Sequence, residues 1–299
     1  MQKKKIIVYL RGGIGNQLFM YATARALSIR NDAELVVDDW SGFVRDKLYN
    51  RSFELKNFKI QARLVSKLEI LYFLFYRLNN RILKSPIKLS KNFFRMHILT
   101  ETDEAKYLPE LKDITLKNCN WLNGLWQSPK YFEHYKEILY KELIPPEPIS
   151  QKFLKLGKKM ISEESVAVGI RLYEDRPKYY SGPDDKLKNS LEINNVLNKI
   201  KNEIPNAKFY IFCTKNFKFL DELRLPENTV KITAENGFKD TVNTLWLLSQ
   251  CKHHVMTNST FYWWGAWLSK YNYQKSKQLI FAFKNFFNKN AIPENWITF

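Results

Sequence analysis

The sequence contains few of the residues that build disulfide frameworks or zinc sites. Its 299 residues include only three cysteines and four histidines. Cys119, Cys213 and Cys251 lie far apart, and no Cys-x-x-Cys pair occurs. Their odd number and wide spacing argue against a disulfide-stabilised secreted domain and against a structural zinc site. This cysteine content is typical of a protein kept in a reducing compartment.

Long hydrophobic runs are also missing. A membrane-spanning helix needs roughly 20 predominantly apolar residues in a row, and no stretch of this sequence approaches that length. The N-terminal lysines resemble the start of a signal peptide, but the short apolar run after them soon meets Arg11 and two glycines. We therefore expect a cytoplasmic protein in which Lys5–Leu10 is a strand leading into a loop.

Acidic residues are scarce relative to basic ones. The sequence has 48 lysines and arginines against 30 aspartates and glutamates, a formal net charge of +18. Such an excess attracts polyanions, and charge alone does not distinguish nucleic acid, an anionic membrane surface and a phosphorylated ligand. The excess is marked in residues 61–99, where Glu69 is the single acid.

The basic segment 61–99 leaves two interpretations open. An apolar stripe predicts a helix at 65–83, with Arg77, Arg81 and Lys84 opposite it. Such a helix either lies on an anionic membrane, as a peripheral contact at its inner face, or is a solvated helix covering the N-terminal domain. We prefer the solvated helix, and we expect no nucleic-acid partner.

The apolar residues, 45% of the chain, follow an alternating strand and helix pattern. Proline-rich Ile144–Ser150 interrupts this pattern, so we expect an N-terminal domain at 1–146 and a C-terminal domain at 147–299. The pattern predicts an α/β fold with two parallel-sheet domains and a cleft between them. The predicted strands are Lys5–Leu10, Glu34–Val37, Trp121–Trp126, Ser165–Ile170, Lys208–Cys213, Val230–Ile232, His254–Met256 and Gln278–Phe281. The predicted helices are Asn16–Arg30, Val65–Leu83, Pro129–Leu143, Leu191–Ile204 and Thr241–Gln250.

Ligands of such folds gather at the carboxyl ends of strands, and the first strand ends in a glycine-rich loop. The loop Arg11–Phe19 reads RGGIGNQLF. Its glycines, Gly13 and Gly15 among them, permit a sharp turn and close approach of a ligand, and the following helix favours anions at its N-terminus. A dinucleotide fingerprint would need glycine where Leu18 stands, which makes a dehydrogenase unlikely. A tight turn without a ligand is an equal alternative, but the carboxamides of Asn16 and Gln17 favour a binding loop.

A second strand end presents charged side chains. The buried strand VAVGI is followed at once by Arg171 and then by Glu174 and Asp175. A guanidinium there can hold a diphosphate through two hydrogen bonds, and a carboxylate can accept the proton of a hydroxyl nucleophile. Charges that pair with one another in a surface loop are the alternative for each single residue, least so for Arg171.

A third strand end runs into the stretch TNSTFYWWGAWL, Thr257–Leu268. Ser259 and Thr260 are expected to cap a helix that begins near Phe261, and their hydroxyls, with the free amides of the first turn, form a phosphate-binding corner. Asn258 belongs to the same polar run. Phe261, Trp264 and Leu268 would anchor this helix to the sheet.

No metal site is expected from the sequence. His253 and His254 have no cysteine or carboxylate at ligand spacing and are interpreted as structural. The acidic pairs Asp38–Asp39 and Asp184–Asp185 are only weak candidates. A site that relies on Arg171 and helix ends needs no divalent cation.

Three blocks of the sequence resemble the α-1,2-fucosyltransferases of glycosyltransferase family 11. They are GGIGNQLFMYATARAL, LNGLWQSPKYF and LLSQCKHHVMTNSTFYWWGAWL, which occur in the family's order along nearly the whole chain. The resemblance implies a GT-B-like architecture of two facing Rossmann-like domains, GDP-fucose as the donor and a galactose-terminated acceptor. It also implies inversion at the fucose anomeric carbon without a metal. We expect the N-terminal domain, residues 1–146, on the acceptor side and the C-terminal domain, residues 147–299, to bind GDP-fucose.

The resemblance assigns roles to individual residues. Arg171, Ser259 and Thr260 would stabilise the departing diphosphate, Asn16 would border the donor sugar, and Glu174 or Asp175 would take the hydroxyl proton. Asp240 is a candidate acceptor for the guanine N–H groups. The family's His-x-Arg-Arg-x-Asp block aligns with Gly169–Glu174, where glycine, leucine and glutamate replace the histidine, the second arginine and the aspartate.

Other function classes remain open at this stage. A different fucosyltransferase that uses GDP-fucose, with another linkage or acceptor, would carry the same donor-binding features. A non-catalytic basic module that binds a membrane or nucleic acid is a further alternative.

Overall fold

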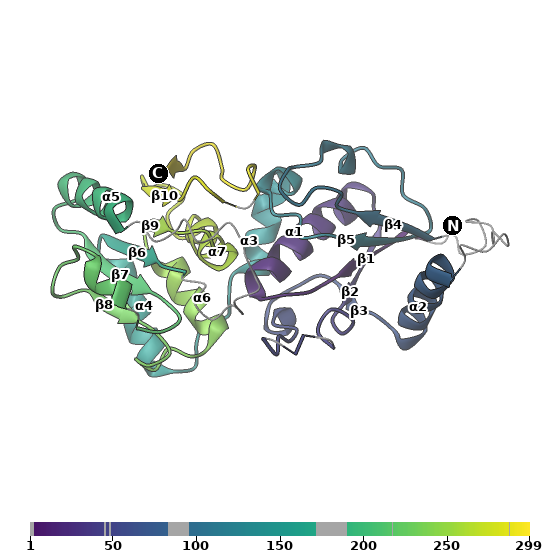
Figure 1. Cartoon of the computed structure of the whole chain (residues 1–299), viewed down its shortest axis with the longest axis horizontal. Helices are drawn as coiled ribbons and strands as arrows, with labels where there is room; N and C mark the ends of the chain where they lie inside the picture. The colour runs from purple at the N-terminus through teal and green to yellow at the C-terminus, as the bar shows by residue number, and fades with distance from the viewer. Residues whose placement is uncertain are drawn as a thin grey trace. The chain divides into compact units, whose positions relative to one another are not determined.

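The computed structural model describes residues 3–44, 46–47, 49–82, 96–171, 190–216, 218–286 and 288–299. The chain divides into two compact units, Met1–Glu142 and Leu143–Phe299 (Figure 1). The boundary between the units follows Glu142. The proline-rich segment had predicted a boundary after residue 146. The assignment of the acceptor to one unit and the donor to the other stays a prediction.

Unit 1 is built on a five-stranded parallel sheet in the order β3-β2-β1-β5-β4. A parallel neighbour must be reached by a crossover connection, so helices follow the strands. The strands are β1 (Lys5–Tyr9), β2 (Glu34–Asp38), β3 (Arg63–Leu64), β4 (Met96–Thr100) and β5 (Cys119–Asn123). The helices are α1 (Ile14–Arg30), α2 (Lys67–Ile82) and α3 (Lys136–Leu143), with short 3-10 turns at Leu55–Asn57, Pro109–Leu111, Pro129–Tyr131 and Glu133–Tyr135.

Two contacts hold the helices of unit 1 in place. Phe73 of α2 stacks on Trp121 of β5, with ring centroids 3.9 Å apart, and both side chains are buried. On α1, Arg25 and Tyr21 both donate hydrogen bonds to the buried carboxylate of Glu142 in α3. Burial raises the pKa of Tyr21 far above its usual range, so its hydroxyl stays a donor. The Glu142 carboxylate thereby ties the middle of α1 to α3.

Unit 2 contains a six-stranded parallel sheet in the order β11-β10-β9-β6-β7-β8 (Figure 1). One face of its central strand, with Val166 and Val168, packs on apolar side chains of α5 such as Leu197 and Ile200. Helix α6 packs against both α4 and α7. The strands are β6 (Ser165–Gly169), β7 (Lys208–Phe212), β8 (Val230–Ile232), β9 (His253–Met256), β10 (Ile280–Ala282) and β11 (Ile297–Thr298). The helices are α4 (Gln151–Ser162), α5 (Ser190–Glu203), α6 (Thr241–Gln250) and α7 (Thr260–Ser269).

The predicted α/β class with parallel sheets is confirmed, and so are most of the strands and helices expected from periodicity. Four elements were not predicted, namely α4, β3, β4 and β11. The stretch predicted as one helix at Pro129–Leu143 is two 3-10 turns followed by α3.

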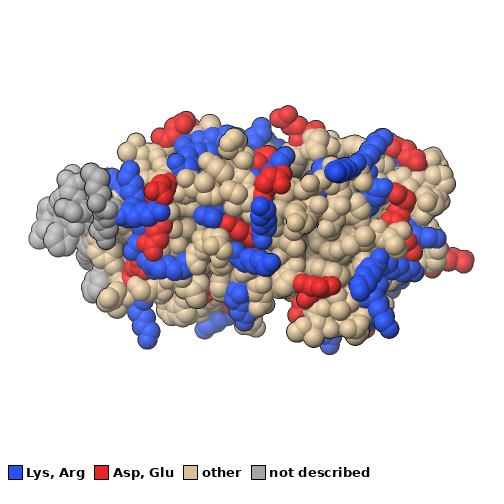
Figure 2. Space-filling view, turned by 180° about the vertical axis from the view of Figure 1, so that it is seen from behind, with Lys and Arg blue, Asp and Glu red and all other residues tan. Residues whose placement is uncertain are grey.

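Basic side chains are spread over the surface rather than gathered in one region of the face drawn in Figure 2, where acidic side chains lie between them. The basic segment 61–99 is described only in part. Residues 83–95 and the side chains of residues 75–82 lie outside the described structure. The preferred solvated helix and the alternative membrane contact of Arg77, Arg81 and Lys84 therefore both stay predictions. No helix among the residues that are described has both the length and the apolar character needed to cross a membrane.

Candidate functional site

In unit 2, the structure brings together two of the three predicted strand ends. Strands β6 and β9 are parallel neighbours, so their carboxyl ends lie side by side. The backbone N–H of Arg171, two residues beyond β6, donates to the Thr257 hydroxyl oxygen at 2.8 Å. That hydroxyl in turn donates to the carbonyl of Gly169 at 3.2 Å. Arg171 is half-buried. Its backbone contacts Thr257, the first residue of the polar run that leads into α7.

The polar run Thr257–Thr260 lies directly before α7, as predicted, but the capping differs. The helix begins at Thr260, one residue earlier than expected, and Ser259 is its N-cap in extended conformation. The Ser259 side chain makes no capping hydrogen bond to the helix, which corrects the expectation that its hydroxyl caps α7. The first amides of a helix have no acceptor within the helix and favour an anion. Asn258, 8% exposed, donates to the carbonyl of Asn285 at 3.3 Å.

The aromatic residues of α7 form its buried side. Trp263, Trp264 and Leu268 are at most 1% exposed, whereas Phe261 is half-buried and lies at the helix start. Phe261 was expected to anchor the helix with Trp264 and Leu268, and its partial exposure shows that it does so only in part. The rigid aromatic packing therefore fixes the position of the α7 N-terminus.

Gly169 shows why this chain lacks the histidine expected at that position. A Cβ atom on Gly169 would lie 2.5 Å from the ring of Tyr262, closer than real Cβ atoms approach other atoms. The Tyr262 hydroxyl donates to the carbonyl of Ile170 at 3.0 Å. The tyrosine ring thus takes the space of a side chain at position 169 and holds the strand end that precedes Arg171.

Asp240, a further predicted site residue of unit 2, has a structural role in this fold. Asp240 is exposed and is the N-cap of α6, where its carboxylate accepts from the backbone N–H of Asn243 at 2.7 Å. This capping explains the aspartate without a ligand, and its proposed contact with guanine stays a prediction. Glu174 and Asp175 lie outside the described residues.

In unit 1, the glycine-rich loop joins β1 to α1. Gly12 has a φ of +73°, Gly13 is the N-cap of α1, and Gly15 is buried in its first turn. Gln17 was expected at the ligand-facing surface, and the structure corrects this. Its side chain is fully buried and bonds to the carbonyls of Gly12 and Ser52 and to the N–H of Glu54. Gln17 therefore stabilises the loop from inside.

Asn16 is half-buried on the first turn of α1, where a ligand-binding side chain was expected. Its carboxamide oxygen accepts a hydrogen bond from the side chain of Gln127 at 3.1 Å. Its nitrogen lies on the side of Gly12, 3.0 Å from the position a Cβ would take there. Gln127 thus holds the oxygen end of the Asn16 carboxamide.

The sequence reasoning did not single out three residues near this loop. Gln127 stands in the block LNGLWQSPKYF, which was used only for the resemblance. The guanidinium of Arg51 lies against Gly13 and 5.1 Å from the Tyr49 ring centroid, and no periodicity signals it. Glu101 directly follows β4, and its burial raises its pKa to about 7. Since β4 itself was not predicted, no strand end pointed to Glu101.

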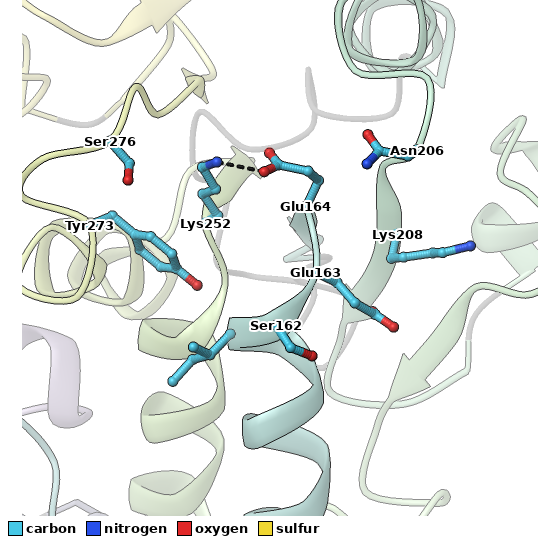
Figure 3. A pocket seen from close by; sticks show the side chains of 9 residues that line it. Ser162, Glu163, Glu164, Asn206, Lys208, Lys252, Tyr273 and Ser276 are labelled. Atoms are coloured by element: carbon cyan, nitrogen blue, oxygen red, sulfur yellow. Dashed lines mark hydrogen bonds and ion pairs between the residues drawn. The ribbon is translucent and has the colours of Figure 1, made fainter.

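A cavity of about 500 Å³ lies elsewhere, at the amino ends of β6, β7 and β9. Figure 3 shows the ion pair of Lys252 and Glu164 near its centre, between Tyr273 and Lys208. Because Arg171 and Ser259 follow the carboxyl ends of the strands, this cavity is at the opposite edge of the sheet. Most of its lining side chains are exposed, and the arrangement gives no reason to place the chemistry there.

Both histidines of the motif have structural roles. His253 is buried, accepts from the N–H of Leu279 at Nδ1 and lies 3.0 Å from Glu164 at Nε2. His254 is buried beside the carbonyl of Cys251, and burial lowers its pKa to about 3. Within the described part of the chain, no group of three or more His, Cys, Asp or Glu side chains has an arrangement that fits a metal ion.

The profile of the family described as Glycosyl transferase family 11 matches residues 5–298, nearly the whole chain. The chain belongs to this family. Among curated proteins, it is 27% identical over 283 residues to an α-1,2-colitosyltransferase of Escherichia coli, covering 89% of this chain and 88% of that protein. It is 24% identical to the O-antigen biosynthesis glycosyltransferase WbnK of Escherichia coli, covering 88% and 89% of the two chains. Because it belongs to this family, the protein is a glycosyltransferase.

Fucosyltransferases are among the solved structures with a similar fold. The fucosyltransferase NodZ from Bradyrhizobium matches with a TM-score of 0.53 and 16% identity, over 89% of this chain and 92% of NodZ. A mutant of Arabidopsis thaliana FUT1 in complex with GDP matches with a TM-score of 0.50 and 11% identity, over 93% of this chain and 70% of FUT1. At these identities the likeness shows the fold, which is GT-B-like.

Proposed function

We propose that this glycosyltransferase transfers fucose from GDP-fucose to the 2-hydroxyl of a terminal galactose on an oligosaccharide or surface glycan, with inversion at the fucose anomeric carbon. The observation that carries the proposal is the junction of Arg171 with Thr257. It places a guanidinium-bearing residue beside the N-terminus of α7, at the carboxyl edge of a parallel sheet. The family relationship over residues 5–298 supports the reaction class.

The charge of this junction suits a departing nucleoside diphosphate. In the reaction, the acceptor oxygen attacks the anomeric carbon of fucose, the bond from that carbon to the β-phosphate oxygen breaks, and the acceptor proton passes to a base. Negative charge grows on the diphosphate, so fixed positive charge there stabilises the transition state more than the ground state. The Arg171 guanidinium supplies that charge. The Ser259 and Thr260 hydroxyls and the first amides of α7 add hydrogen bonds to the diphosphate. We therefore propose that the reaction needs no divalent cation.

Roles for other residues follow from the same chemistry. Asn16, with its oxygen held by Gln127, offers N–H donors to an oxygen of the donor sugar. Glu174 or Asp175 would accept the acceptor proton, and Asp240 would accept from guanine. These three roles are proposals.

A second donor is favoured by one specific observation. The Escherichia coli relative that is 27% identical is named as an α-1,2-colitosyltransferase. Colitose is fucose without its 3-hydroxyl group, so both donors present the same nucleoside diphosphate to Arg171. A 3-hydroxyl that is hydrogen-bonded in the site would favour GDP-fucose, because its loss leaves a buried polar group unpaired.

The test is a direct assay of transfer. The protein is incubated with GDP-fucose or GDP-colitose and a panel of β-galactosides, with and without EDTA, and the product linkage is determined. We expect an α-1,2-linked product whose yield EDTA does not change. Transfer of colitose alone would replace the proposed donor, another linkage would replace the regiochemistry, and loss of activity with EDTA would contradict metal independence.

A further inference from the structure

The loop that follows β5 is held in an unusual conformation around one buried carboxyl group. Glu101 is 7% exposed, and one of its oxygens, Oε2, accepts from the backbone N–H of Leu125 at 2.6 Å and of Trp126 at 2.9 Å. Gly124 makes this approach possible, because a Cβ there would lie 2.4 Å from the Cβ of Glu101. Trp126 has a φ of +53°, a conformation that costs a bulky residue of the order of 1–2 kcal/mol.

Packing and hydrogen bonds offset the cost of this backbone conformation. The Trp126 indole is 2% exposed and packs edge-on against Tyr131, with ring centroids 5.5 Å apart. The backbone N–H of Glu101 itself continues the ladder of β4 with β5 by donating to the carbonyl of Asn123. The carboxyl group therefore connects two neighbouring strand ends, and the left-handed residue persists because its N–H and its ring are both held.

The direction of the loop matters for the next residue. Gln127 is 5% exposed, and its amide nitrogen donates to the carboxamide oxygen of Asn16 at 3.1 Å. A turn of the backbone at Trp126 would move Gln127 away from α1. Asn16 would then lose the hydrogen bond that holds its carboxamide oxygen.

We propose that Glu101 is a positioning residue, which fixes the loop at residues 123–127 and through Gln127 orients the carboxamide of Asn16. The effect on catalysis rests on the proposed function, in which Asn16 contacts the donor sugar. The effect on the Asn16 carboxamide rests only on the contacts above. In both, Glu101 acts without touching a substrate.

The other carboxyl oxygen agrees with this role. Oε1 of Glu101 is buried, and among the described residues it has no hydrogen-bond partner. Buried carboxyl groups left half-satisfied are costly, and those that persist need a reason. Holding two consecutive amide groups of a strained loop next to the predicted ligand-binding loop is such a reason.

The test compares two replacements of Glu101. Glu101→Met keeps the approximate size but removes both acceptors, whereas Glu101→Gln keeps an acceptor oxygen for the two N–H groups. We expect kcat per folded molecule to fall about 10- to 100-fold in Glu101→Met, because small misplacements of contacting groups cost that much. Glu101→Gln should recover most of this loss. In an Asn16→Ala background, Glu101→Met should have little further effect on kcat, since coupled residues are not additive.

A buried carboxylate in the same unit provides the matched control. Glu142 is 5% exposed and pairs with Arg25 and Tyr21 rather than with the loop. Glu142→Gln should lower the melting temperature without lowering kcat per folded molecule. Equal losses of kcat in Glu142→Gln and Glu101→Met, or a full effect of Glu101→Met in the Asn16→Ala background, would reduce Glu101 to a purely structural residue.

A second measurement needs no activity. In protein labelled with nitrogen-15 asparagine, the side-chain amide signal of Asn16 is identified by its loss in Asn16→Ala. We expect this signal to shift in Glu101→Met and to stay in place in Glu142→Gln. An unmoved signal in Glu101→Met overturns the proposal, and absence of transfer from any donor overturns only the proposed function.

Discussion

Arg171 owes its place to backbone contacts made by residues about 90 positions away in the chain. Its N–H binds the Thr257 hydroxyl, Thr257 binds the carbonyl of Gly169, and Tyr262 binds the carbonyl of Ile170. Three consecutive residues of one strand end are thus held by the strand and helix of the neighbouring motif. Rigid placement of this kind is what electrostatic stabilisation of a transition state requires.

Replacement of Arg171 tests this role directly. Arg171→Ala should lower kcat for transfer from GDP-fucose by on the order of 100-fold or more, because it removes fixed positive charge from the leaving diphosphate. Arg171→Lys should recover part of the loss, since it restores the charge but not the two-point geometry. The exposed Arg224 of the same unit supplies the control, and Arg224→Ala should leave the rate unchanged. Transfer at the original rate in Arg171→Ala would show that the site is wrongly assigned.

Glu101 makes a prediction about pH and stability. Burial and the nearby Glu104 raise its pKa from 4.5 to about 7, against the opposing effect of Arg11 and the two backbone N–H groups. Because the pKa is higher in the folded state, the folded protein binds the proton more tightly. Its contribution to stability is therefore complete below pH 4.5 and is lost as the pH rises through 7.

The measurement is the free energy of unfolding between pH 5 and pH 8 by denaturant titration. We expect the Glu101 contribution to decline by about 2–3 kcal/mol over this range, since one pKa unit corresponds to about 1.4 kcal/mol. Glu101→Gln cannot titrate and should show a flatter dependence by that amount. An identical slope in the variant and the parent protein would mean that Glu101 titrates normally in the folded state.

At the scale of elements, the strands and helices with clear periodicity were predictable and the edges were not. β1, β6, β7 and α6 have continuous apolar runs or a helical stripe with capping residues, and each lies within one or two residues of its predicted bounds. β3 and β11 contain two residues each and carry no pattern of their own. They form because the exposed backbone groups of a neighbouring strand, β2 or β10, hydrogen-bond to them. No local sequence pattern predicts such pairing.

The element most constrained by close approach is the end of β6 against α7. Gly169→Ala would place a methyl group 2.5 Å from the Tyr262 ring, so α7 or the strand must shift. We expect a loss of about 1–3 kcal/mol in the free energy of unfolding, the usual cost of overpacking. Thermal unfolding measures it. Gly13→Ala is the comparison, because a Cβ there has its nearest neighbour at 3.4 Å and should be tolerated. Equal stability of the two variants would contradict the tight packing.

At the scale of the whole molecule, the sequence predicted which strand ends carry polar residues but not how each residue is used. Arg171 and Ser259 were predictable because they directly follow buried strands. Gln17 was misplaced because helical periodicity does not show that a carboxamide inside a helix bonds to a loop 35 residues away. The N-cap role of Asp240 was not predicted, and its contact with guanine stays a prediction. The contact of Gln127 with Asn16 depends on β1 and β5 being neighbours in the sheet. The order of strands in a sheet cannot be predicted from local sequence patterns.

Binding of GDP to the intact chain tests the assignment of the donor to unit 2. At GDP concentrations about 100 times Kd, binding should stabilise the protein by about 2.7 kcal/mol. Hydrogen exchange with and without GDP locates the effect. We expect slower exchange at the start of α7, because its first amides would bind the diphosphate, with EDTA making no difference. Exchange should also slow at Ile170–Arg171, because a ligand held by the Arg171 side chain would reduce local opening of that strand end. Protection confined to the loop Arg11–Gln17 would contradict this assignment. It would place the diphosphate in unit 1, bound by the glycine-rich loop at the start of α1.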